Sequence, residues 1–71
     1  MPKKTRELKG MLRRAGFVEK PGKGSHVNFW HPTVRGTFIT ISGKDGNDAR
    51  EYLEKKVAFA IDLVRKALES M

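Results

Sequence analysis

Cysteine is absent from this 71-residue chain, and histidine occurs only twice. The absence of cysteine excludes disulfide bonds and a cysteine nucleophile. Two separated histidines without cysteine match no usual ligand spacing of a structural zinc site. We therefore expect no metal and no other cofactor, and a fold that depends on one small hydrophobic core.

Long hydrophobic runs are also missing. No apolar stretch approaches the roughly 20 residues that span a bilayer, and the start, Met1-Pro-Lys-Lys4, is not followed by the apolar part of a signal peptide. We expect a cytoplasmic protein with no membrane segment.

A hydrophobic content of 38% is normal for a globular chain, so residues 1–71 are expected to form a single domain.

Acidic residues are scarce in the first third of the chain. Residues 1–24 contain eight Lys and Arg against two Glu, whereas residues 48–71 contain five residues of each sign. Most of the net charge of +7 therefore lies near the N-terminus. This layout is typical of a surface that binds a polyanion such as nucleic acid. A basic surface that serves only solubility is the alternative.

Two helices are predicted from apolar residues at helical spacing. The first covers 5–15, with Thr5 as its N-cap, and ends at Gly16. The second begins near Asp48 and Glu51, which resemble a capping box, and runs for roughly 20 residues.

Three strands are predicted between the helices, over 17–20, 26–31 and 37–42, with residues 32–36 as a hairpin loop. The order of helix, three strands and helix predicts an α+β fold. We expect a three-stranded antiparallel sheet with both helices on one face and the other face open.

The register of the hairpin follows from matching residues of like polarity. Placing Phe29 opposite Ile39 achieves this along both strands, whereas a slip of one residue would oppose Val27 to Thr40. In the favoured register the open face carries His26, Asn28, Trp30, Phe38, Thr40 and Ser42.

His26 follows the loop Pro21-Gly-Lys-Gly-Ser25. Imidazole can take or give a proton at neutral pH, so His26 is the best-placed general acid or base. The backbone N–H groups of Gly22 and Gly24, together with Lys23, can hold the charge that grows on a phosphate. This chemistry suits RNA cleavage in which His26 deprotonates a 2′-hydroxyl. An inert surface histidine is the alternative.

Other residues near this loop suit contact with RNA. Trp30 and Phe38 can stack unpaired bases, can form the centre of a protein interface, or can simply pack under a loop. Lys20 and Lys23 are expected to hold the phosphate backbone. The predicted RNA-binding residues are Lys20, Lys23, Gly24, Ser25, Asn28 and Trp30.

His31 is not expected to act together with His26. Five residues of strand place the two about 16 Å apart, and the odd spacing turns them to opposite faces. We interpret His31, which precedes Pro32, as a strand-ending residue bonded to the hairpin loop.

The chain contains, in order, Leu12-Arg-Arg-Ala-Gly-Phe17, Lys23-Gly-Ser-His26 and Phe29-Trp-His-Pro32, then a strand and an apolar helix. Over about residues 5–68 this pattern resembles the HicA family of toxins from bacterial toxin–antitoxin pairs. The Gly-Ser-His triplet is its most specific element. Many relatives carry Val-Pro and a further histidine at the end of the third strand, where this chain reads Ile39-Thr-Ile-Ser-Gly-Lys-Asp-Gly46.

The resemblance implies a fold similar to the double-stranded RNA-binding domain and an mRNA-cleaving activity that stops translation. It also implies a HicB-type antitoxin that masks the active surface. By the same resemblance His26 is the catalytic residue, with Gly24 and Ser25 shaping its loop.

Three hypotheses therefore compete. The first is a metal-independent ribonuclease toxin that uses His26. The second is a non-catalytic RNA-binding module in which His26 only contacts phosphate or a 2′-hydroxyl. The third is a protein-interaction domain with an acidic partner.

Overall fold

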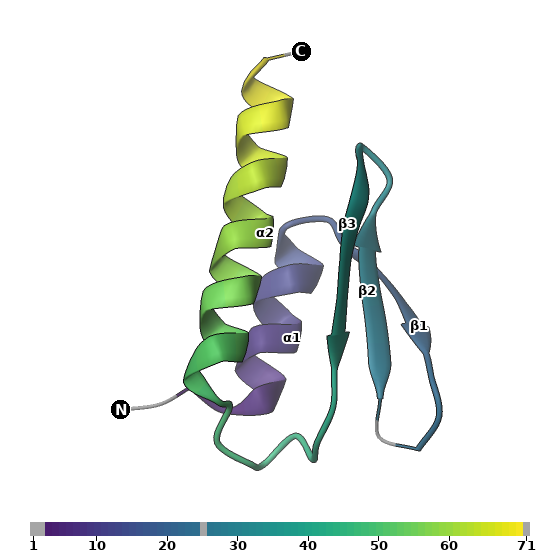
Figure 1. The fold of residues 1–71 in the computed structure, drawn as a ribbon, viewed down its shortest axis with the longest axis vertical. Helices are drawn as coiled ribbons and strands as arrows, with labels where there is room; N and C mark the ends of the chain where they lie inside the picture. The colour runs from purple at the N-terminus through teal and green to yellow at the C-terminus, as the bar shows by residue number, and fades with distance from the viewer. Residues whose placement is uncertain (1–2, 25, 71) are drawn as a thin grey trace.

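The computed structural model describes residues 3–24 and 26–70. Within these ranges the elements are α1 (Thr5–Arg14), β1 (Val18–Pro21), β2 (Val27–His31), β3 (Val34–Ile41) and α2 (Glu51–Glu69). The strands form one antiparallel sheet in the order β1-β2-β3, and both helices lie against the same face of it (Figure 1). The predicted α+β fold is confirmed.

The core lies between the two helices and this face of the sheet. Burying each large apolar side chain there contributes roughly 1.5–3 kcal/mol. The largest fully buried side chains come from α1, β2, β3 and α2, and are Leu8, Leu12, Phe29, Ile41, Val57 and Val64. Every layer of the fold therefore supplies part of one continuous core.

The predicted hairpin register is confirmed. Phe29 lies opposite Ile39, and the pairs on either side follow the same register. The regular ladder ends where Val27 meets Ile41, so His26 and Ser42 lie beyond the strands. His26 therefore belongs to the loop that precedes β2.

The hairpin loop is shorter than predicted, and the assignment of 32–36 as loop is wrong. β3 begins at Val34, which pairs with His31, so only two residues form the turn. The register shifts between Trp30 and His31, and the extra residues of β3 include Gly36 with a φ of +84°. Glycine is typical of loops, but at an irregularity of this kind a strand can continue through it.

Neither predicted N-cap caps its helix. Lys4 is the N-cap of α1, while Thr5 is buried and its Oγ1 donates to the Asn47 carbonyl at 3.2 Å. Arg50 is the N-cap of α2, and Asp48 instead forms an ion pair with Lys4 at 2.5 Å. Both side chains thus join the start of α1 to the loop before α2, and this tertiary role replaces the capping role.

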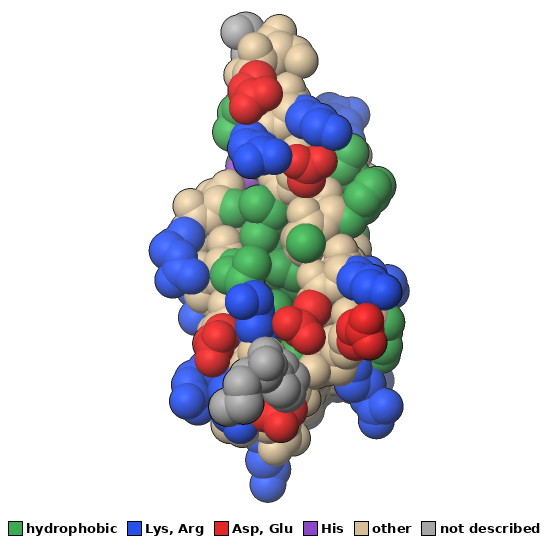
Figure 2. Space-filling model, turned by 90° about the vertical axis from the view of Figure 1, so that its left-hand side faces the viewer, with side chains coloured by type: hydrophobic (Ala, Val, Ile, Leu, Met, Phe, Trp, Pro, Cys, Tyr) green, Lys and Arg blue, Asp and Glu red, His purple; other side chains and the backbone are tan. Residues whose placement is uncertain are grey.

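The outer face of the helices carries a strip of apolar side chains along its middle, bordered by charged residues (Figure 2). Met11 of α1 and Ala58 and Ile61 of α2 line a shallow groove between the two helices. Even so, none of the helices in the described chain is both long and apolar enough to cross a membrane.

Candidate nucleic-acid interface and active site

His26 ends a short loop that leads from β1 into β2. The Gly22 N–H donates to the His26 carbonyl at 2.8 Å, and the His26 N–H donates to the Lys23 carbonyl at 3.0 Å. The prediction that the Gly22 N–H holds a phosphate is therefore wrong, because this N–H already has a partner within the loop. Gly24 has a φ of +59°, in the left-handed region that favours glycine. The predicted residue Ser25 lies outside the described residues. The loop therefore holds His26 by its backbone and leaves the side chain exposed.

A hydrogen bond within this loop orients the His26 ring. Its Nδ1 lies 3.0 Å from the carbonyl oxygen of Lys23. Because a carbonyl oxygen only accepts, Nδ1 carries the proton, and in the neutral ring the lone pair is on Nε2. The exposed imidazole can therefore use Nε2 as a general base.

Gly22 packs directly against His26. A Cβ built on Gly22 would lie 3.3 Å from both the Cβ and the carbonyl oxygen of His26, and 3.4 Å from Nδ2 of Asn28. These separations are shorter than the optimal contact of about 3.5–4.0 Å between carbon atoms. A Cβ at this position therefore fits only if His26 or Asn28 moves by a few tenths of an ångström.

A polar row crosses the open face of the sheet beside the loop. Lys20, Asn28 and Thr40 are successive cross-strand neighbours on β1, β2 and β3, so their side chains share one face. The Thr40 hydroxyl donates to Oδ1 of Asn28 at 2.7 Å. With Oδ1 held in this way, Nδ2 is the end of the Asn28 amide that approaches Gly22. Asn28 thus presents N–H donors next to the loop that carries His26.

A second row on the same face is apolar. Val18, Trp30 and Phe38 are cross-strand neighbours, and all three side chains are exposed. Val18 was not among the predicted site residues, although its parity with Lys20 on β1 indicates the same face. The open face therefore combines a polar row near His26 with an apolar row further along the strands.

Comparison with protein families matches residues 5–69 to the family described as the HicA toxin of bacterial toxin-antitoxin. The chain belongs to the HicA family. A search of the curated proteins finds no match. Family membership makes this chain one of the toxins of bacterial toxin–antitoxin systems and implies an antitoxin as its partner.

The second histidine of this HicA-family chain has a structural role. His31 is buried, its Nδ1 accepts from the Thr33 N–H at 3.1 Å, and its Nε2 donates to the Ala15 carbonyl at 3.2 Å. Its ring also meets Phe17 edge to face, with the centroids 5.2 Å apart. The interpretation of His31 as a strand-ending residue bonded to the hairpin is confirmed, since both ring nitrogens serve the fold.

Ion pairs use some of the basic residues of α1. Arg13 donates twice to the Glu19 carboxylate at 2.9 Å, and this hydrogen bonding raises the pKa of Arg13 and lowers the pKa of Glu19. The nearly buried ammonium of Lys9 donates to Asp45 at 2.7 Å, and this hydrogen bond lowers the pKa of Asp45. These two pairs give Arg13 and Lys9 partners within the fold and leave fewer unpaired cations on α1.

The two lysines predicted for the site remain available. Lys20 and Lys23 are exposed, and neither forms an ion pair with any residue in the described ranges. Lys20 lies next to Asn28, and Lys23 lies in the His26 loop. Two exposed cations therefore lie on the segments next to His26, one in its own loop and one on β1.

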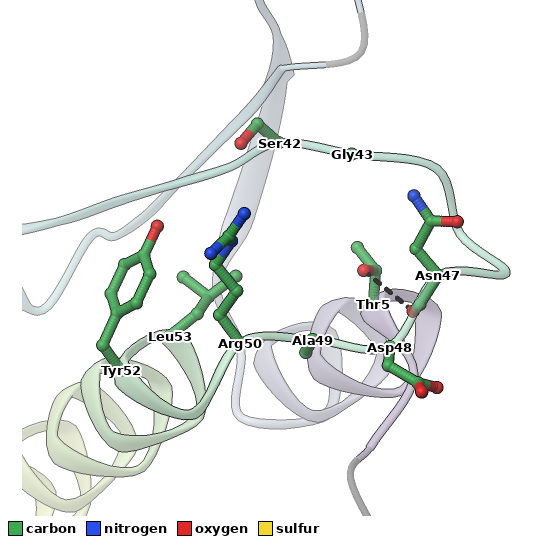
Figure 3. Close-up of a pocket in the computed structure, with 9 residues that line it drawn as sticks. All are labelled: Thr5, Ser42, Gly43, Asn47, Asp48, Ala49, Arg50, Tyr52 and Leu53. Carbon is green, nitrogen blue, oxygen red and sulfur yellow. Dashed lines mark hydrogen bonds between the residues drawn. The ribbon is translucent and has the colours of Figure 1, made fainter.

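The candidate site is a surface and not an enclosed cavity. A cavity of about 510 Å³ lies elsewhere, between the end of β3 and the start of α2, and Figure 3 shows Ser42, Arg50 and Tyr52 on its border. Of the predicted site residues that the structure describes, none lines it. Residues 3–24 and 26–70 also contain no cluster of three His, Asp or Glu side chains that could hold a metal ion. An open surface of this kind suits a polymer such as RNA.

Proposed function

We propose that this HicA-family toxin is a ribonuclease that cleaves mRNA and thereby blocks translation, with His26 as its catalytic residue. The observation that carries the proposal is the hydrogen bond between Nδ1 of His26 and the Lys23 carbonyl. It leaves Nε2 as the basic nitrogen of an exposed ring within a cationic loop. The Gly-Ser-His triplet on which the resemblance to HicA toxins depends includes the same histidine.

In the proposed reaction Nε2 of His26 takes the proton of a 2′-hydroxyl. The O2′ atom then forms a bond to the adjacent phosphorus, and the bond from phosphorus to the 5′-oxygen of the next nucleotide breaks. Solvent water protonates that 5′-oxygen, and the imidazolium returns its proton to solvent. The products are a 2′,3′-cyclic phosphate and a free 5′-hydroxyl, and the reaction requires no metal ion.

The neighbouring groups hold the phosphate while its charge grows. We assign this role to Lys20 and Lys23 as cations, to the backbone N–H of Gly24, and to the Nδ2 group of Asn28. Of these, Lys20 and Asn28 are cross-strand neighbours, which supports a common role. Trp30, on the same face, is assigned to stacking with an unpaired base.

The partner and the setting follow from the same assignment. We propose that residues 1–71 act as a single toxin domain in the cytoplasm, where mRNA is found. A HicB-type antitoxin would mask the surface around His26. The basic charge of the chain suits both an RNA substrate and an acidic surface on this antitoxin.

A substrate lacking one hydroxyl tests the reaction. We would incubate the purified toxin with a short RNA and with the same RNA carrying a 2′-deoxynucleotide at the cleaved position, each with and without a chelator. We expect cleavage of the RNA in both buffers, cyclic phosphate ends on its products, and no cleavage at the deoxynucleotide. Cleavage at the deoxynucleotide, or complete loss of cleavage with the chelator, would contradict the proposed mechanism.

A further inference from the structure

The outer edge of β3 is available for pairing with another strand. The sheet order leaves edges at β1 and β3. β1 has four residues, includes the charged Glu19 and Lys20, and ends in Pro21, features that discourage edge pairing. In β3 the regularly paired residues 38–41 carry no charge, Arg35 is the strand's one charged residue, and no other strand in the described chain pairs with the outer edge. An edge of this kind is a template for an added strand.

Helix α2 places apolar side chains next to this edge. A groove of about 420 Å³ lies between the two elements, lined by Phe38 and Thr40 of β3 and by Lys56, Phe59 and Leu63 of α2. Phe59 is 66% exposed and Leu63 is 40% exposed, so neither is needed to complete the core. Figure 1 shows α2 and β3 running alongside each other. A segment paired with β3 would cover both apolar side chains. We call this surface the β3 groove.

The apolar surface between α1 and α2 is a weaker candidate for a docking site than the β3 groove. Towards the C-terminal end of α2 its lining includes Leu68 together with Arg14, Arg65 and Glu69, so both signs of charge border it. It also presents no strand edge. The β3 groove has one charged lining residue, Lys56, and combines apolar side chains with backbone groups of an edge strand.

Charge indicates which occupant fits the β3 groove. Lys56 lines it and Arg35 lies on β3, and neither has a carboxylate partner among residues 3–24 and 26–70. Pairing of two copies through β3 would bring these cations together in chains that each carry a net charge of +7. RNA fits poorly, because Phe38, Phe59 and Leu63 line the groove and Lys56 is the one cation among its lining residues. An extended peptide segment with apolar and acidic residues complements the groove.

We propose that the β3 groove is the docking site of the antitoxin, which adds one extended segment along the edge of β3. Its apolar side chains would cover Phe59 and Leu63, and its carboxylates would pair with Arg35 and Lys56. This inference rests on the proposed function in one respect, namely that the partner is an antitoxin. Because Thr40 of β3 contacts Asn28, the added strand lies close to the polar row beside His26.

The test measures how the cognate HicB-type antitoxin binds to the wild type and to two groove variants, Phe59→Glu and Leu63→Glu. The matched control is Leu68→Glu, which places the same substitution on an exposed residue of the same helix outside the groove. By calorimetry we expect each groove variant to lose roughly tenfold or more in affinity, as for central interface residues, and the control to bind like the wild type. All three variants should retain RNA cleavage. Hydrogen exchange should show new protection of β3 amides in the complex.

Failure of this inference can be separated from failure of the proposed function. If the wild type binds the antitoxin, but the groove variants bind equally well and β3 gains no protection, the docking site is wrong and the ribonuclease assignment is unaffected. If the antitoxin does not bind the wild type, both the partner and the docking site are wrong. Protection of β3 by RNA, or by self-association of the toxin, would also overturn the inference because it identifies a different occupant.

Discussion

Nδ1 of His26 lies 3.0 Å from the carbonyl oxygen of Lys23, three residues earlier in the chain. A carbonyl group of the loop backbone, and not a carboxylate side chain, therefore determines which nitrogen of this imidazole carries the proton. His31 shows the contrasting case, since both of its nitrogens bond to backbone groups and its ring is buried. Of the two histidines, His26 is the one whose Nε2 can meet a substrate.

Gly22→Ala tests whether the fit between Gly22 and His26 matters for the reaction. The added Cβ would lie 3.3 Å from the Cβ of His26, so the histidine must move. Displacing a catalytic group by a fraction of an ångström lowers its efficiency, and we expect cleavage to fall by roughly 10- to 100-fold. The measurement is kcat/KM on a short RNA.

Gly46→Ala is the matched control, because no atom lies within 4 Å of the Cβ that it adds. We expect this variant to cleave RNA like the wild type. Equal activity of the two alanine variants would show that the packing of Gly22 on His26 has no role in the reaction.

Thr40→Val tests the orientation of Asn28. Valine cannot donate the 2.7 Å hydrogen bond to Oδ1, so the amide can rotate and Nδ2 is no longer directed towards the loop. We expect kcat/KM to fall by about 2- to 10-fold, the equivalent of one hydrogen bond. Thr40→Ser keeps the hydroxyl and should restore the activity.

Thr33→Val, in the hairpin turn, controls for the loss of a hydroxyl from an exposed threonine. If Thr40→Ser is as impaired as Thr40→Val, the hydrogen bond to Asn28 does not explain the effect.

The sequence was sufficient to predict the parts of the fold that depend on alternation and helical spacing. The register of β2 and β3 followed from matching Phe29 with Ile39, and the exposure of Trp30 on the open face followed from strand parity. Both predictions depend on the fact that successive side chains of a strand point to opposite faces of the sheet.

The sequence was insufficient where long-range contacts override local signals. Thr5 and Asp48 are good capping residues, yet both bond across the chain to hold the start of α1 against the loop before α2. Gly36 is typical of a loop in the sequence, whereas the pairing of Val34 with His31 extends β3 through this glycine. The hydrogen bond from Nδ1 of His26 to Lys23 depends on loop geometry and has no signature in the sequence.

Asp45→Asn tests the ion pair that attaches α1 to the loop after β3. The hydrogen bond from Lys9 lowers the pKa of Asp45 below its ordinary value of 3.8. A carboxyl group whose pKa is lower in the folded state stabilises the fold above its ordinary pKa, and this contribution is lost as the pH falls through the folded pKa. We therefore expect the variant to unfold at a lower temperature than the wild type at pH 7 and the difference to shrink towards pH 2.

Thermal unfolding followed by circular dichroism at several pH values measures this effect. Glu69→Gln serves as the control, because its carboxylate has no ion pair in the described part of the chain. A difference between Asp45→Asn and the wild type that stays constant from pH 7 to pH 2 would show that the Asp45 carboxylate does not act through its charge.

The most direct test of the account is RNA cleavage by His26→Ala compared with RNA binding by the same variant. Removing the general base should lower the cleavage rate by about 10²- to 10⁴-fold, while the affinity for a non-cleavable RNA stays close to that of the wild type because Lys20 and Lys23 remain exposed. A variant that binds RNA but does not cleave it would support His26 as the catalytic residue. A correctly folded variant that cleaves RNA at the wild-type rate would contradict the central claim.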